Sequence, residues 1–191
     1  SAGGQSVLAL FASPKARGLF QRGIVQSAYG IPSSTREKAR RVSIKVASSL
    51  GVSAASASAA QLRAIPAQRF ATPFQGEDMS LAPGFVSGDN VLLEPILETF
   101  QKQRQAKLPL IIGSNSDEAT VATAFGLDPA DVVSRLGAGK VLLKPLYPGV
   151  SDPAQLGREA IRDLVFTAYA RRIAYLHSQQ APTWRYYFSH V

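Results

Sequence analysis

Leu108-Pro109-Leu110-Ile111-Ile112, followed by Gly113-Ser114-Asn115, is the stretch from which the fold of this 191-residue chain is predicted. A continuous apolar run ended by turn-forming residues is typical of a buried strand in a parallel sheet, and proline is tolerated near the start of such a strand. The run Gly23-Ile24-Val25-Gln26 has the same character and predicts a second strand. Alternating side chains from Trp184 to Val191 predict a third.

Helical patterns separate these strands. Between 66 and 91 the frequent prolines and glycines predict mostly loop. In the last helix we expect Ile161, Leu164, Val165, Ala168 and Leu176 on one side. The predicted helices cover residues 1–11, 34–50 with Ser34 as N-cap, 53–65, 96–105 and 157–177. Strands alternating with helices predict the α/β class, with a largely parallel sheet and flanking helices.

Composition narrows the class of protein. With 46% apolar residues the chain can bury a core of its own, and the absence of cysteine excludes disulfides and thiolate chemistry. The net charge of +8 concentrates before Gln75, where one helix carries a run of basic residues without interleaved aromatics. We therefore expect a solvated helix face and no nucleic-acid partner. No membrane span or signal peptide is predicted, so the chain is expected to be soluble, in a bacterial cytoplasm or secreted.

The ends of the chain also carry information. No strand precedes Ser1, and the last predicted strand runs to the final residue, Val191. We therefore expect residues 1–191 to be a single partial domain, truncated at both ends.

Acyl transfer by a serine needs a hydroxyl on a sharp turn, backbone N–H groups for the oxyanion, and a base oriented by an acid. The nucleophile elbow of such enzymes reads Gly-x-Ser-x-Gly, and Ser1-Ala2-Gly3 matches its last three positions. Glu118 follows the predicted strand that ends at Ile112, which is where open α/β sheets place their chemistry. Taken alone, Ser1 would by default be an ordinary terminal residue, and Glu118 would be a solvated loop carboxylate.

Three further stretches extend this match. The segment from Ser1 through Ser13-Pro14 to Gly18–Ser27 resembles the region after the nucleophile in type-B carboxylesterases, the family of cholinesterases and bacterial para-nitrobenzyl esterases. Gly88-Asp89-Asn90 with Glu94-Pro95, and then Leu108 to Glu118, resemble the approach to its acidic residue. Asp163–Ala174 and Arg185–Ser189 resemble the helix and strand before its histidine. The resemblance implies a partial α/β-hydrolase fold.

The resemblance also implies site residues. Ser1 matches the nucleophile, Ala2 the oxyanion-hole N–H donor, and Glu118 the triad acid. The chain departs from the family at Ala119 and at Ser27-Ala28, where glycine is usual after the acid and after the serine. Neither departure removes a reacting group.

The family's histidine has no match in this chain, because it lies beyond the strand that the chain ends in. His177 is expected to be a solvated residue at the polar end of a helix, and His190 a surface or capped residue at a strand end. Asp117 is expected to be a structural hydrogen-bonding partner. The aromatics Trp184, Tyr186 and Phe188 are expected to fill a core face.

The first functional hypothesis is a carboxylic ester hydrolase that acts through an acyl-enzyme on small-molecule esters, without metal or organic cofactor, and that is inactive as this isolated chain. The alternative is a non-catalytic, cholinesterase-like binding or structural module. A third hypothesis has Ser1 using its own α-amino group as base, which would require an antiparallel sheet. Acyl and alcohol preferences and oligomeric state are not predicted.

Overall fold

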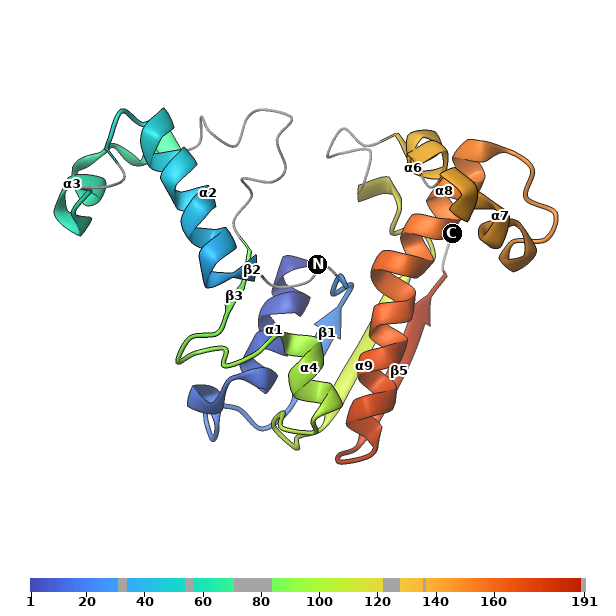
Figure 1. Cartoon of the computed structure of the whole chain (residues 1–191). Coiled ribbons are helices and arrows are strands. Elements are labelled where there is room, and N and C mark those ends of the chain that lie inside the picture. The colour runs from blue at the N-terminus through green and yellow to red at the C-terminus, as the bar shows by residue number, and fades with distance from the viewer. Residues whose placement is uncertain (31–33, 54–56, 71–83, 122–127, 136, 190–191) are drawn as a thin grey trace. The chain divides into compact units, whose positions relative to one another are not determined.

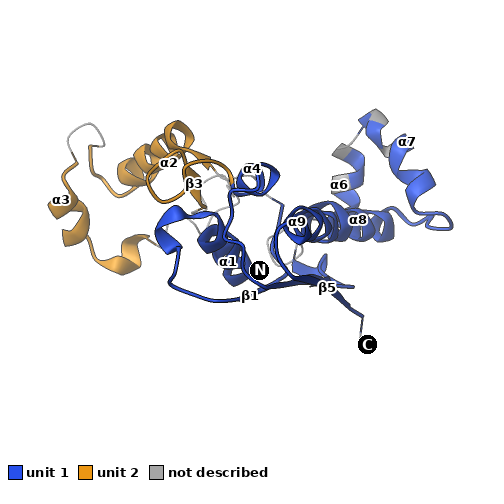
Figure 2. Cartoon of the chain, turned by 90° about the horizontal axis from the view of Figure 1, so that it is seen from below, with its two compact units in different colours: residues 1–32, 96–191 blue, residues 33–95 orange. Residues whose placement is uncertain are grey.

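The computed structural model describes residues 1–30, 34–53, 57–70, 84–121, 128–135 and 137–189 (Figure 1). The chain forms two compact units, residues 1–32 with 96–191 and residues 33–95 (Figure 2). The elements in chain order are α1 (Ala2–Ala12), η1 (Pro14–Ala16), β1 (Gly23–Gln26), β2 (Ser34–Thr35), α2 (Arg36–Ser49), α3 (Ala59–Ala64), η2 (Ala67–Phe70), β3 (Val86–Ser87), α4 (Ile96–Gln101), β4 (Leu110–Asn115), α6 (Pro129–Arg135), η5 (Gly137–Gly139), α7 (Lys140–Leu143), η6 (Lys144–Leu146), α8 (Pro153–Ile161), η7 (Arg162–Thr167), α9 (Ala168–Ser178) and β5 (Thr183–Phe188).

The first unit is built on a parallel sheet with strand order β1-β4-β5. Ile24 is in register with Ile111, and Ile111 with Trp184, so the strand predicted from Leu108–Ile112 lies at the centre. The strand continues through Gly113-Ser114-Asn115, which were expected to end it. Gly113 fits there because the Tyr186 side chain lies against it, where a Cβ would clash. Both strand pairs of this sheet are parallel, which is the layout that the third hypothesis does not allow.

Helices cover one face of this sheet. Figure 2 shows α1, α4 and α9 on the same side of the strands. On that side Val25 and Ile112 are fully buried, and Leu8, Phe11, Phe100 and Ile173 complete the core. The α1 helix predicted from residue 1 is confirmed.

The opposite face is uncovered among the described residues. Ile24, Ile111 and Trp184 are 56%, 39% and 56% exposed, and Phe188 is 56% exposed. The expectation that Trp184 and Phe188 fill a core is therefore wrong. They alternate correctly for a strand, but β5 is an edge strand and they lie on its open face.

The long helix expected over 157–177 is longer and interrupted. It begins at Pro153, where the Asp152 carboxylate caps the Gln155 N–H at 2.8 Å, and ends at Ser178. Residues Arg162–Thr167 form a π-helical turn, whose i→i+5 bonding adds a residue to the turn. The buried face shifts accordingly: Leu164 is 61% exposed, whereas Phe166 is buried.

A helical hairpin packs on α8. The side chains of Val133, Leu143, Leu156 and Ala160 form its core, and Tyr147 and Val150 pack against them. This hairpin of α6, η5, α7 and η6 has no counterpart in the sequence prediction.

The second unit contains α2, α3 and a parallel pair, β2 and β3. The N-cap of α2 is Thr35, whose Oγ1 accepts a hydrogen bond from Lys38 N at 3.2 Å, and not Ser34, which is paired in β2. Of the helix expected over 53–65, the structure has α3 from Ala59 to Ala64, which begins at a capping box formed by Ser58 and Gln61, and residues 54–56 lie outside the described residues. Residues 71–83 of the expected loop lie outside the described residues.

The expected helix over 96–105 ends early, at Gln101. Gln103 adopts a left-handed backbone with φ of 55°, which terminates the helix and turns Gln105 inward. Gln105 is 1% exposed, and its Nε2 lies 3.2 Å from Nδ1 of His177.

His177 is fully buried, so the expectation of a solvated histidine is wrong. Its Nε2 lies 2.8 Å from the Leu108 carbonyl oxygen, and its ring packs against Phe11 and Phe100 with centroid separations of 5.5 and 5.7 Å. The Gln105 amide donates to Nδ1, so the Nε2–H tautomer, which donates to Leu108, satisfies both bonds. The α9 turn that looked polar in sequence is covered by α1 and α4.

This burial makes stability depend on pH. Burial lowers the pKa of His177, and the bond to the Leu108 carbonyl offsets only part of that effect. Above the ordinary pKa of 6.5 both folded and unfolded chains are neutral at this residue. Below it the unfolded chain gains a proton first, so the free energy of unfolding falls by up to about 1.4 kcal/mol per pH unit.

We expect His177→Gln to be less stable than the parent chain at pH 7.5 but to lose less stability between pH 7 and 5.5. Urea unfolding at several pH values measures how steeply the free energy of unfolding changes with pH in the parent chain and in the variant. Equal slopes would show that His177 does not titrate on unfolding.

Candidate active site

Ser1 is the N-cap of α1, and its side chain makes no capping hydrogen bond. It is exposed, and its carbonyl oxygen accepts the Gln5 N–H at 3.0 Å. Ala2 is the first helical residue, so its N–H has no acceptor within the helix. The positive end of the helix dipole also lies here. The hydroxyl and the N–H that the sequence singled out therefore meet at one helix terminus.

Close packing fixes the start of α1 against the end of β1. A Cβ placed on Gly4 would lie 2.5 Å from the carbonyl oxygen of Gln26, the last residue of β1. One residue on, the buried Gln5 side chain donates from Nε2 to the Tyr29 carbonyl at 3.1 Å. The first turn of α1 is thus held at the carboxyl edge of the sheet.

Glu118 follows β4 at the same edge. Its side chain is buried, and Oε1 accepts the Asn115 N–H at 2.7 Å. Because Gln26 is in register with Gly113, the ends of β1 and β4 lie side by side. Glu118 is therefore a held carboxylate and not the solvated residue of the plainer interpretation.

Asn115 also links Glu118 to the end of β1. Its Nδ2 donates to Ser27 Oγ at 3.4 Å, and Ser27 N–H donates to the Gly113 carbonyl at 2.9 Å. Ser27 has a left-handed φ of 55°, which is uncommon for a residue with a side chain. Neither Asn115 nor Ser27 was predicted to have a role at the site, although both lie within the motifs that resemble the family.

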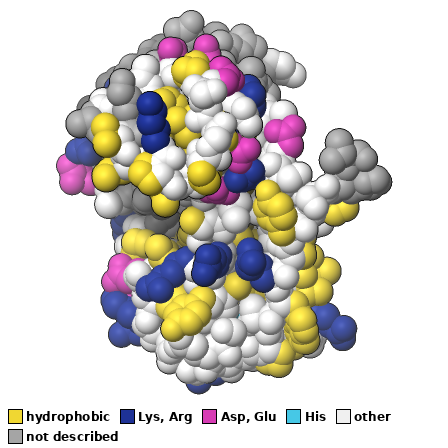
Figure 3. All heavy atoms as spheres, turned by 90° about the vertical axis from the view of Figure 1, so that its right-hand side faces the viewer, with side chains coloured by type: hydrophobic (Ala, Val, Ile, Leu, Met, Phe, Trp, Pro, Cys, Tyr) yellow, Lys and Arg dark blue, Asp and Glu magenta, His cyan; other side chains and the backbone are white. Residues whose placement is uncertain are grey.

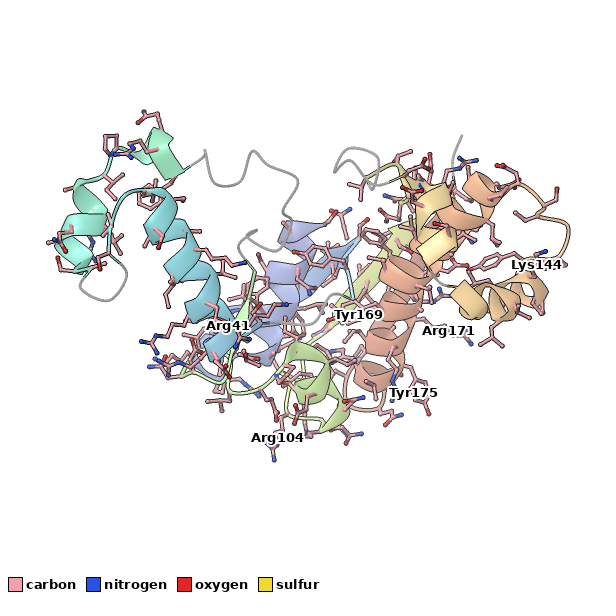
Figure 4. All side chains as sticks on the ribbon, turned by 45° about the horizontal axis from the view of Figure 1, so that its top comes forward. Arg41, Arg104, Lys144, Tyr169, Arg171 and Tyr175 are labelled. Carbon is pink, nitrogen blue, oxygen red and sulfur yellow. The ribbon has the colours of Figure 1, made fainter. Side chains whose placement is uncertain are left out.

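Two tyrosines, Tyr186 and Tyr169, interact with residues at this edge of the sheet. Burial and the negative charge of Glu118 raise the pKa of Tyr186, on β5. Burial raises the pKa of Tyr169 to about 12. Figure 4 shows Tyr169 extending from α9 toward α1. Neither tyrosine is set up to ionise near neutral pH.

The π-helical turn joins the same edge through a polar network. Asp163 accepts hydrogen bonds from Arg162 Nε at 2.8 Å and from the Tyr147 hydroxyl at 2.9 Å. Burial opposes ionisation of Asp163, but these bonds outweigh it and hold its pKa below the usual range. Thr167 lies 3.3 Å from Ser114 on β4, hydroxyl to hydroxyl, and the Val165 carbonyl accepts the Gly30 N–H at 2.7 Å.

The two departures from the family pattern are both buried. Ala28 is 1% exposed and Ala119 is 2% exposed, the latter packed with Ile161. Asp117 is exposed, and its carbonyl oxygen accepts the Thr120 hydroxyl at 3.0 Å, which leaves the expected side-chain role a prediction. Nothing is lost from the site at these positions.

Among the described residues, no histidine is placed next to Ser1. His177 bonds to Leu108, at the amino end of β4, whereas Ser1 and Glu118 lie at the carboxyl edge. His190 lies outside the described residues. Within the part of the chain that the structure describes, no cluster of three or more histidine and acidic side chains suits a metal, and no helix is long and apolar enough to cross a membrane.

Comparison with known proteins gives the family. The sequence model of the Carboxylesterase family matches residues 1–139. The chain belongs to this family. It is 27% identical over 215 residues to pyrethroid hydrolase Ces2a of Mus musculus, covering all of the chain and 38% of that protein.

Solved structures of esterases share the fold. Carboxylesterase EST55 of Geobacillus stearothermophilus superposes with a TM-score of 0.82 at 22% identity, over all of the chain and 43% of that protein. A PNB esterase superposes with a TM-score of 0.73 at 24% identity, over all of the chain and 43% of that protein. A thermophilic PNB esterase superposes with a TM-score of 0.63 at 26% identity, over 98% of the chain and 41% of that protein. The α/β-hydrolase fold is confirmed. The chain spans about two fifths of the length of these relatives.

The tight contact at Gly4 gives a stability prediction. Gly4→Ala should destabilise the chain by about 1–3 kcal/mol, because the new methyl group meets the Gln26 backbone oxygen. Gly3→Ala is the matched control: nothing lies within 4 Å of its Cβ position, so it should stabilise the helix by about 0.5–1 kcal/mol. Urea unfolding compares the two. If Gly4→Ala stabilised the chain as much as Gly3→Ala, α1 would not press on β1 at this point.

Proposed function

We propose that this chain carries the nucleophile and the acid of a serine carboxylesterase. The observation that supports the proposal is that the start of α1 and Glu118 both lie at the carboxyl edge of the sheet. Gly4 of α1 packs against the backbone of Gln26, and the Asn115 N–H donates to the Glu118 carboxylate. The family membership and the esterase names of the similar proteins support it.

In the proposed reaction Ser1 Oγ attacks the ester carbonyl carbon while a histidine takes its proton. The oxygen that gains negative charge accepts a hydrogen bond from the Ala2 N–H, at the positive end of α1. The alcohol leaves with the proton, and an acyl-enzyme remains. Water then attacks the acyl group with the same histidine as base, which releases the carboxylic acid and restores Ser1.

Glu118 orients and stabilises the charged histidine in this scheme. A buried carboxylate held by a backbone N–H keeps a fixed position, which that role requires. Neither the buried His177 nor the undescribed His190 is assigned as the base. We propose that the base comes from polypeptide beyond these 191 residues, and that the substrates are neutral, lipophilic carboxylic esters.

A chimeric esterase tests the proposal. Residues 1–191 replace the segment of a PNB esterase that they match, and hydrolysis of para-nitrophenyl acetate is measured. Ser1→Ala should lower kcat on the order of 10⁴-fold or more, and Glu118→Gln by about 10³-fold to 10⁴-fold. Asp117→Asn, next in the chain and exposed, is the matched control and should retain activity.

If Glu118→Gln and Asp117→Asn changed kcat equally, Glu118 would not be the triad acid. If Ser1→Ala kept full activity, Ser1 would not be the nucleophile. Circular dichroism of each variant establishes that the chimera is folded.

The 191-residue chain by itself should show negligible hydrolysis of the same ester, because no base faces Ser1 among the described residues. The comparison is with Ser1→Ala at equal concentration. Turnover well above that of Ser1→Ala would place a base within these 191 residues.

A further inference from the structure

Two glutamine side chains are buried in the first unit. Gln5 is 3% exposed and Gln105 is 1% exposed, and the Oε1 atom of each has no hydrogen-bond partner among the described residues. On the face shown in Figure 3, by contrast, hydrophobic, basic and acidic side chains lie side by side, so no single kind of group marks a site there. A buried amide with an unpaired oxygen costs free energy. Gln105 bonds to the buried His177, whereas Gln5 lies in the first turn of α1.

The backbone of Gln5 fixes the peptide group that carries the proposed oxyanion donor. The Gln5 N–H donates to the Ser1 carbonyl oxygen at 3.0 Å. That carbonyl and the Ala2 N–H belong to one planar trans peptide group and point in opposite directions. The bond from Gln5 therefore sets the direction in which the Ala2 N–H points, and a shift of residue 5 would turn the donor with it.

The side chain of Gln5 ties this turn to two other segments. Its Nε2 donates to the carbonyl of Tyr29, three residues after β1, at 3.1 Å. A hydrogen bond with the Gln5 side chain also offsets part of the rise that burial causes in the pKa of Tyr169, on α9. The Tyr169 side chain lies against Gly30, where a Cβ would be 3.2 Å from the Tyr169 Cβ, and the Gly30 N–H donates to the Val165 carbonyl at 2.7 Å. Gln5 is thus held by the loop after β1 and by the long helix.

We propose that Gln5 is a positioning residue for the oxyanion donor: its buried side chain anchors the first turn of α1 so that the Ala2 N–H points at the developing negative charge. The Tyr29 carbonyl and the Tyr169 hydroxyl are the two anchor points. Because its side chain is buried, Gln5 acts through Ala2 and does not contact the ester. The inference rests on the proposed function, since it takes Ala2 as the donor to the oxyanion.

Gln5→Met in the chimeric esterase separates positioning from folding. Methionine is close to glutamine in size but cannot donate to the Tyr29 carbonyl, and the lost bond is offset by removal of the unpaired Oε1, so the midpoint of urea unfolding should change little. We expect kcat for para-nitrophenyl acetate to fall about tenfold to hundredfold, because the donor is misaimed. KM should stay within about twofold of the parent value.

A transition-state analogue gives a second readout in the same chimera. A trifluoromethyl ketone adds to the serine hydroxyl to form a hemiketal oxyanion, so its affinity should fall in Gln5→Met by about the same factor as kcat. A purely structural role for Gln5 would lower the amount of folded enzyme without changing the affinity of the folded fraction.

Gln105→Met is the matched control. It removes a buried glutamine whose Oε1 is likewise unpaired, but whose amide bonds to His177 at the opposite edge of the sheet. It should leave kcat of the folded enzyme unchanged. The proposal is overturned if both methionine variants lower kcat equally, or if Gln5→Met raises KM and leaves kcat unchanged. Neither result bears on the proposed function, which Ser1→Ala and Glu118→Gln test separately.

Amide hydrogen exchange of the 191-residue chain tests the anchor without any turnover. In Gln5→Met the protection of the residue-5 N–H should fall about tenfold, because the first turn opens more often, whereas the N–H of Ile173 in α9 should keep its protection. Tyr169→Phe, which keeps the ring against Gly30 and removes only the hydroxyl, should lower protection of the same N–H to a smaller extent. Unchanged protection at residue 5 in Gln5→Met would also overturn the proposal.

Discussion

The contact between the first turn of α1 and the end of β1 is the constraint on which the candidate site depends. At Gly4 the helix lies so close to the Gln26 carbonyl that a methyl group does not fit. This contact brings the free N–H of Ala2 and the side chain of Ser1 to the carboxyl edge of the sheet. A larger residue at position 4 would lift the helix terminus away from that edge, so the small residues after Ser1 set the site's geometry as well as the turn.

The centre of the sheet completes the arrangement. Asn115, the last residue of β4, bonds through its backbone to Glu118 and through its side chain to Ser27 after β1. In the π-helical turn, Thr167 contacts Ser114 within β4, and the Val165 carbonyl accepts the N–H of Gly30, which follows β1. The Glu118 carboxylate is thus held by the end of β4 and is linked through Asn115 to Ser27 after β1, whereas His177 packs at the opposite edge, between Phe11 of α1 and Phe100 of α4.

The sequence correctly predicted the strands and the helix whose patterns depend only on residues that are neighbours in the chain. The β1 and β4 runs and the α1 helix were found because a buried parallel strand and a small-residue helix start have distinct compositions. The roles of Ser1, Ala2 and Glu118 came from family resemblance and remain proposals. His177 was misjudged because its burial depends on Phe11 and Phe100, which are distant in sequence. Trp184 shows the same limit, since alternation gives no sign of which sheet face is covered, and the π-helical turn that exposes Leu164 has no sequence signal that we recognise.

The central claim is that Ser1 and Glu118 act as one unit at the carboxyl edge. A double-mutant cycle on kcat in the chimeric esterase measures this directly, with Ser1→Ala, Glu118→Gln and both together. If the two residues serve the same step, the double variant should be no slower than Ser1→Ala alone, because the acid has nothing left to assist. Independent effects that multiply in the double variant would contradict the claim.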